Sequence, residues 1–180
     1  MIGLFVFLRN PKGIANRTWG LFTLSIVVWT FGQFMESTIM VESNALQWNY
    51  FLLPGVIFIP ISFMNFMFAL QDCLYENRHL IRIVYFTGGI FIILLFTNNL
   101  IKGVVYRAPF GFYSNPKILY YLFLLFFLLV VVYTYTITFI KYKSFNEHKK
   151  LQLNYLIAAT IIGFICGTFN FLPAFNVPTT

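Results

Sequence analysis

Charged side chains are scarce in this chain of 180 residues. They make up only 9% of it, whereas 59% of the residues are hydrophobic and 21% are aromatic. Soluble domains carry about 25% charged residues, so a soluble fold of this length could not cover so much apolar surface with polar groups. Lipid must therefore cover it. The net charge of +7 does not indicate nucleic-acid binding, because the basic residues lie between apolar runs, as in membrane topologies.

Residues that carry out catalysis or bind metals are also few. The two cysteines, Cys73 and Cys166, fall near opposite membrane faces in the topology below, which excludes a disulfide between them. The two histidines lack metal-ligand spacing, and no phosphate loop or nucleophile elbow is present. Asp72 and Glu76 could share a proton, but a solvated helix end explains them better. We expect no enzymatic activity, no metal and no cofactor.

Five apolar runs are long enough to cross a bilayer as helices, which takes about 20 residues. Because open sheet edges cannot exist in lipid, the sequence predicts a single all-α, polytopic membrane domain over residues 1–180. The predicted helices cover residues 17–37, 48–71, 80–101, 117–141 and 150–172, preceded by a short apolar segment at 2–8. Asn16 is the expected N-cap of the first helix. Pro54 and Pro60 are expected to bend the second.

The basic residues are distributed unevenly between the two sides of this topology. One side holds nine of them, Arg9, Lys12, Arg17, Arg78, Arg82, Lys141, Lys143, Lys149 and Lys150. The other side holds three, Lys102, Arg107 and Lys117. The positive-inside rule makes the side with nine cytoplasmic. Five crossings from the cytoplasmic loop at 9–17 then place the end of the chain outside, and the short segment at 2–8, as the last turns of an earlier helix, places the first residues outside as well.

Four stretches, each containing a loop or part of a predicted helix, are informative when they are taken in order. They are "LFVFLRNPKGIANRTWGLFTLSIVVWTFGQFMES", "GVIFIPISFMNFMFAL", "APFGFYSNPKILYYLFLL" and "HKKLQLNYLIAATIIGFICGTFNFLPAFNVPTT". In this order they resemble the N-terminal seven-helix membrane region of bacterial sensor histidine kinases, with Trp29, Glu36 and Pro60 at familiar positions. The resemblance implies a multi-pass protein of the bacterial inner membrane in a two-component signalling system. It also implies that this chain lacks the first part of helix one, helix seven and the catalytic output domain.

A polar stripe on the first predicted helix indicates a candidate binding site. Trp29, Gln33 and Glu36 share one helical face. A charge at mid-membrane costs about 2.5–3.5 kcal/mol, so Glu36 should face a partner or a wet cavity, and Lys102 and Arg107 are candidate partners. Polar residues of other segments fall at the same outer level. The predicted ligand-binding residues are Trp29, Gln33, Glu36, Asn98, Asn99, Tyr113 and Asn170. Hydrogen bonding between helices is the alternative explanation.

Other polar and small residues are expected to join helices. Asn65 and Asn154 lie in the inner halves of their helices, where each can hydrogen-bond a neighbour. Ala159, Gly163 and Gly167 form a ridge at four-residue spacing that permits close approach of another helix, in the same chain or in a second copy.

Three functional hypotheses follow. The first is a sensory module that binds a small, apolar ligand near the outer leaflet and relays helix movement to a cytoplasmic output domain. The second is a channel or transporter subunit, although no series of ionisable residues crosses the predicted bilayer. The third is a structural membrane partner of a separate kinase. The expected partners are the lipid bilayer, a small ligand, and a second copy or a separate signalling domain, but no nucleic acid.

Overall fold

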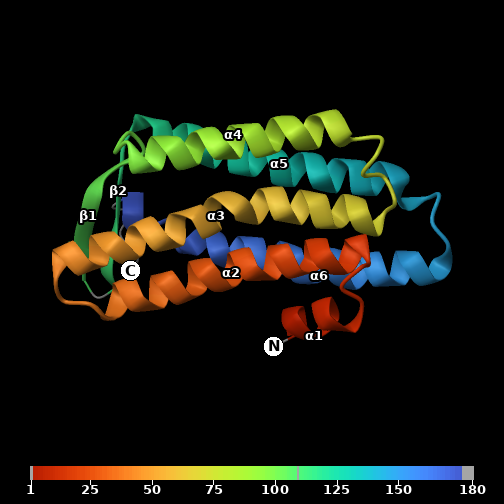
Figure 1. The fold of residues 1–180 in the computed structure, drawn as a ribbon, viewed down its shortest axis with the longest axis horizontal. Coiled ribbons are helices and arrows are strands. Elements are labelled where there is room, and N and C mark those ends of the chain that lie inside the picture. Colours follow the sequence, from red (N-terminus) through yellow and green to blue (C-terminus); the bar gives the residue numbers. More distant parts are fainter. Residues whose placement is uncertain (1, 109, 176–180) are drawn as a thin grey trace.

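Long helices that run side by side dominate the fold (Figure 1). The structure, a computed structural model, describes residues 2–108 and 110–175. In this part of the chain five helices are long and apolar enough to cross a membrane, which confirms the predicted polytopic all-α class. They are α2 (Ile14–Thr38), α3 (Glu42–Leu70), α4 (Arg78–Phe96), α5 (Ile118–Tyr142) and α6 (Glu147–Phe169). The predicted position of the last residues, 176–180, lies outside the described residues.

Helix α3 is the centre of the bundle. About 78% of its most apolar window is buried, against 11% to 28% for the other four long helices. Its apolar character on all sides is typical of a helix that neighbours cover on most of its surface. Pro54 and Pro60 both lie inside α3, which continues through them. Gly55 lets α3 approach α2 closely, because an added Cβ there would lie 2.9 Å from the carbonyl oxygen of Ser25 and from the amide nitrogen of Trp29.

The short N-terminal apolar segment forms α1 (Ile2–Arg9), which folds back beside α2 (Figure 1). The side chain of Asn16 donates a hydrogen bond to the carbonyl oxygen of Val6, 2.6 Å away, and so links the two helices. The prediction that Asn16 caps α2 was therefore wrong. Helix α2 begins at Ile14, three residues before its predicted start, and no side chain caps it at the N-cap position, Gly13.

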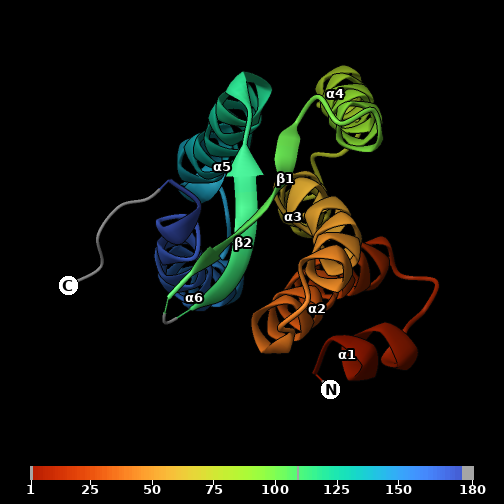
Figure 2. The same cartoon turned by 90° about the vertical axis from the view of Figure 1, so that its left-hand side faces the viewer.

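The connection between α4 and α5 contains a β-hairpin that the sequence interpretation missed. Strands β1 (Ile101–Arg107) and β2 (Gly111–Pro116) pair antiparallel, with Val105 opposite Tyr113. Figure 2 shows the hairpin crossing the ends of the helices. We call this the hairpin end of the bundle, and the other end the opposite end. Helix α4 stops at Phe96, five residues before the predicted end at 101, because the chain turns through a left-handed backbone at Asn98 (φ 57°) to enter β1.

Gly111 joins the hairpin to the end of α2. Its φ of +94° is a conformation that L side chains rarely adopt, and an added Cβ would lie 2.9 Å from the carbonyl oxygen of Ser37. Residues Gly111 to Ser114 of β2 are buried. The final 3₁₀ turn η1 (Pro173–Phe175) packs under the hairpin, next to β2. The hairpin therefore closes one end of the bundle over the side chains of α2 and α3.

Candidate functional site

A polar cluster lies beneath the hairpin. Glu36 of α2 is 1% exposed and Asn49 of α3 is completely buried. The side-chain nitrogen of Asn49 donates to Glu36 Oε1 and to Ser114 Oγ, both at 2.8 Å. One amide group thus joins α2, α3 and β2. The partner found for Glu36 is this amide and not the lysine or arginine expected from the outer loop.

A small cavity of about 20 Å³ opens inside this cluster. It has room for about one water molecule. Its lining comes from α2, α3, β2, α5 and the segment after α6, and consists of Trp29, Gln33, Glu36, Leu52, Leu53, Val56, Tyr113, Ser114, Tyr120, Asn170, Phe171 and Ala174. Within the described part of the chain, Gln33 Nε2 and Asn49 Oδ1 are buried without a hydrogen-bond partner. A buried polar atom left unpaired costs about 1–3 kcal/mol, so a water molecule or another small polar group in this cavity would be stabilised by these two atoms.

Tyr113 shows that solvent has little access to the polar cluster. It lies on β2, outside the membrane-spanning helices, and is 9% exposed. Burial raises the pKa of Tyr113 above its ordinary value, and the nearby Glu36 carboxylate raises it further. The phenol therefore stays protonated and can act as a hydrogen-bond donor or acceptor.

The structure brings together five of the seven predicted ligand-binding residues, Trp29, Gln33, Glu36, Tyr113 and Asn170. The other two, Asn98 and Asn99, do not line this cavity. Asn98 Oδ1 accepts a hydrogen bond from the Tyr50 hydroxyl, and its backbone carbonyl accepts one from Lys117. The Asn99 side chain donates to the Thr97 hydroxyl at 3.0 Å. The early end of α4 explains the difference, since both asparagines lie in the turn after the helix.

Asn49 and Ser114 are the members of the polar cluster that the sequence interpretation missed. Asn49 is a polar residue near the start of an apolar run, which is a usable signal. The predicted start at residue 48 placed it in the first turn of the helix, at the outer interface, whereas α3 begins at Glu42. The six extra residues add about 1.7 turns to the start of the helix, so Asn49 lies within the bundle.

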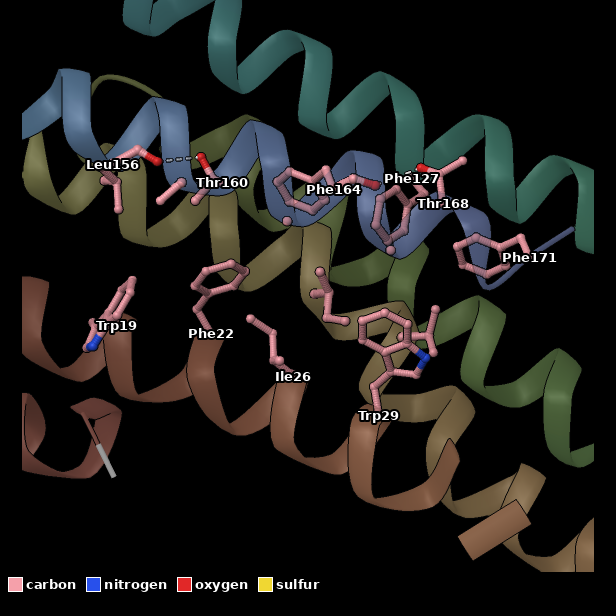
Figure 3. Close-up of a pocket in the computed structure, with 15 residues that line it drawn as sticks. Trp19, Phe22, Ile26, Trp29, Phe127, Leu156, Thr160, Phe164, Thr168 and Phe171 are labelled. Carbon is pink, nitrogen blue, oxygen red and sulfur yellow. Dashed lines mark hydrogen bonds between the residues drawn. The ribbon is translucent and has the colours of Figure 1, made fainter. Parts of the chain in front are cut away.

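A larger, apolar cavity of about 290 Å³ lies between α2 and α6. Figure 3 shows Trp19, Phe22, Ile26 and Trp29 of α2 on one side, facing Thr160, Phe164 and other side chains of α6 on the other. We call this cavity the α2–α6 groove. It shares Trp29, Val56 and Phe171 with the polar cavity, so the two cavities adjoin each other across these side chains at the hairpin end.

The small-residue ridge of α6 lines this groove. An added Cβ at Gly167 would meet the Trp29 ring at 3.3 Å, whereas the space beside Gly163 is open. The ridge therefore contacts α2 only at the hairpin end. Asn65 and Asn154 join helices as expected, since Asn65 donates to the Tyr85 hydroxyl and Asn154 accepts from the Tyr142 hydroxyl.

At the opposite end, two ion pairs connect the α3–α4 turn to α5 and α6. Asp72 pairs with Lys149 at 2.6 Å, and Glu76 pairs with Lys141. We call these four residues the ion-pair cluster. Each carboxylate thus has its own lysine, and the two do not share a proton. Between them Cys73 is completely buried, and this burial raises the pKa of its thiol. In the described residues no group of three or more histidine, cysteine or acidic side chains could hold a metal ion.

A family model described as the N-terminal 7TM region of histidine kinase matches residues 1–180. The chain belongs to this family. The region is the sensory and not the catalytic part of such kinases, and no catalytic domain is found in residues 1–180. No curated protein and no solved structure matched the chain.

Proposed function

We propose that this membrane sensory region receives its signal at the polar cluster and transmits it to the ion-pair cluster. Membership of the sensor-region family supports the sensory role. The observation that carries the proposal is the bridge made by Asn49, which holds Glu36 and Ser114 beside a cavity where Gln33 Nε2 is unpaired. A ligand that pairs with this donor would change the contacts of α2, α3 and the hairpin together.

The proposed orientation puts the hairpin end outside the cell. The basic residues support it, because the ion-pair cluster and the nine basic residues fall at the opposite end, which the positive-inside rule makes cytoplasmic. An external ligand then reaches the polar cluster first. The ion-pair cluster faces the compartment in which histidine kinases carry out their output.

Helix α3 and helix α6 both run from one cluster towards the other. Asn49 lies near the start of α3 and Leu70 at its end, about 30 Å apart at 1.5 Å per residue. Lys149, in the first turn of α6, pairs with Asp72 just after α3. A ligand shifts this assembly only if it binds one helix arrangement more tightly than another.

The native thiol of Cys73 is a reporter for this relay. In lipid nanodiscs and in a Cys166→Ser background, a membrane-permeant maleimide should label buried Cys73 slowly. Asn49→Leu removes both bonds of the bridge, and we expect it to speed labelling at least fivefold. The matched control is Asn65→Leu, which removes the bond to Tyr85 five residues before the end of the same helix, nearer to Cys73 than Asn49 is.

The comparison of the two variants decides the proposal. If Asn65→Leu speeds labelling as much as Asn49→Leu, the effect is general loosening, and the relay from the hairpin end is wrong. An unchanged labelling rate in Asn49→Leu would likewise contradict it.

A further inference from the structure

The α2–α6 groove is a long apolar channel. It extends along α2 from Trp19 to Trp29, ten residues or about 15 Å of helix. A carbon chain advances about 1.3 Å per C–C bond of 1.5 Å, so the groove matches an extended chain of about twelve carbons. Its volume of about 290 Å³ is near the lower end of small-molecule sites, about 300–1,000 Å³.

The walls of the groove offer no free hydroxyl hydrogen to a ligand, because the threonines in them are already hydrogen-bonded. The two threonines that line it, Thr160 and Thr168, donate their hydroxyl hydrogens to carbonyl oxygens of their own helix, at 2.8 and 2.7 Å. Thr160 also accepts a hydrogen bond from the Tyr135 hydroxyl. Six aromatic rings, from α2, α5, α6 and the segment after α6, line the groove, and aliphatic or small residues form the rest of the wall (Figure 3). Such a surface favours an alkyl tail, because a polar tail would find few hydrogen-bond partners there.

The hairpin end of the groove is different, because there it meets the polar cavity. Gln33 Nε2 is a buried donor without an acceptor. Glu36 accepts one hydrogen bond from Asn49, and a carboxyl group can accept several more. A head group here must accept from Gln33 and donate to Glu36. At about 20 Å³ the cavity admits a group the size of a hydroxyl and excludes a phospholipid head group.

We infer that the α2–α6 groove binds a single-chain amphiphile, with its alkyl tail between α2 and α6 and a hydroxyl-sized head at Gln33 and Glu36. This ligand class rests on the proposed function, since the head occupies the proposed receiving site. Selectivity comes from the head, because lipid tails solvate an alkyl chain as well as the groove does.

Tryptophan fluorescence in nanodiscs tests this binding directly. Trp19 and Trp29 line the groove, and Trp48→Phe removes the third tryptophan. The probe is 12-bromododecan-1-ol, whose bromine quenches nearby indoles. Its methyl ether has the same tail but cannot donate a hydrogen bond. We expect saturable quenching by the alcohol at concentrations at least tenfold lower than those needed for the ether.

Two glycine variants provide a matched pair. The space beside Gly163 in the groove and beside Gly89 on α4 is open in both cases. Gly163→Phe should fill the groove and abolish saturable quenching, whereas Gly89→Phe should leave it intact. Gln33→Leu should remove the preference for the alcohol over the ether.

Several outcomes would overturn the inference. Equal, non-saturable quenching by alcohol and ether would mean that ordinary lipid fills the groove. Quenching that survives Gly163→Phe would place the probe elsewhere. A cross-linked dimer through α6 that excludes the probe would assign the groove to a second copy. Maleimide labelling of Cys73 in the presence of the alcohol separates this inference from the proposed function. Saturable quenching without any change in the labelling rate supports binding in the α2–α6 groove and contradicts the relay to the ion-pair cluster.

Discussion

Replacement of Asn49 by leucine should damage the fold more than its small change in volume suggests. The side chain is completely buried and makes two hydrogen bonds of 2.8 Å, one to the Glu36 carboxyl and one to the Ser114 hydroxyl. Leucine fills a similar volume but leaves both acceptors without this donor. The variant therefore removes the bridge between α2, α3 and β2 without opening a large cavity.

The magnitude follows from these two bonds. A bond to a neutral partner contributes about 0.5–1.5 kcal/mol and one to a charged partner about 1.5–3 kcal/mol. Pairs of membrane helices average only about 0.6 kcal/mol per bond, because the unfolded chain in the membrane also finds partners. We expect Asn49→Leu to lower the free energy of unfolding by about 2 kcal/mol, between the membrane estimate of about 1 and the soluble estimate of about 3.

The assay is unfolding by sodium dodecyl sulfate in mixed micelles, followed by circular dichroism, for the four proteins of a double-mutant cycle. Asn49→Leu and Glu36→Leu should couple by about 1 kcal/mol, since each removes the same bond. The control cycle is Asn65→Leu with Tyr85→Phe, which tests one ordinary bond of 3.0 Å between α3 and α4. A coupling between Asn49 and Glu36 below about 0.3 kcal/mol would refute the bridge.

Three further predictions concern backbone contacts and thiol chemistry. Gly55→Ala should cost about 1–3 kcal/mol in the same assay, because its Cβ meets α2 backbone, whereas Gly163→Ala should change stability by less than about 0.5 kcal/mol. Gly111→Ala should cost about 1–3 kcal/mol, since it forces a strained φ and a clash with Ser37; a neutral result would contradict the hairpin geometry. Because burial raises the pKa of Cys73, its maleimide labelling rate should keep increasing with pH above the ordinary thiol value, and an earlier plateau would contradict this shift.

The five long helices could be predicted from the sequence because lipid imposes a length and an apolar composition on each of them. The hairpin could not be predicted by the same criterion, since residues 101–116 belong to none of the five candidate spans and that constraint does not apply to them. Local signals were present, among them the β-branched pair Val104 and Val105 and the turn glycine Gly111. When helices are assigned by the length of apolar runs, a segment between two runs is treated as a loop, and its strand and turn residues are overlooked.

The candidate site was predictable where it depends on one helix alone. Trp29, Gln33 and Glu36 lie on a common face whatever the neighbours do, because the helical period fixes it. The partners required the tertiary structure. Asn98 and Asn49 fell at the ends of predicted helices, where the boundaries were wrong by five and six residues. Errors of this size move a side chain to another face or out of the helix, so the partner of Glu36 could not be named from the sequence.

A ligand in the groove should displace α6 and leave α2 in place, because the two helices are held differently. Helix α2 meets α3 backbone at Gly55, whereas α6 buries only Leu153 and Ile157. Movement of α6 would pull on Lys149 in its first turn, and hence on Asp72. The relay therefore depends on two properties of α6: it is loosely packed along its length, and Lys149 at its start is ion-paired with Asp72.

Spin-label distances in a cysteine-free background test this asymmetry. Suitable label positions, each exposed, are Val27 on α2, Phe58 on α3 and Ile162 on α6. Filling of the groove by Gly163→Phe should lengthen the distance between α6 and α3 by a few ångströms, on the order of half an aromatic ring width, and leave the distance between α2 and α3 unchanged. If α2 moves instead, the rigid pair is α3 with α6, and the ion pair between Asp72 and Lys149 cannot report the ligand.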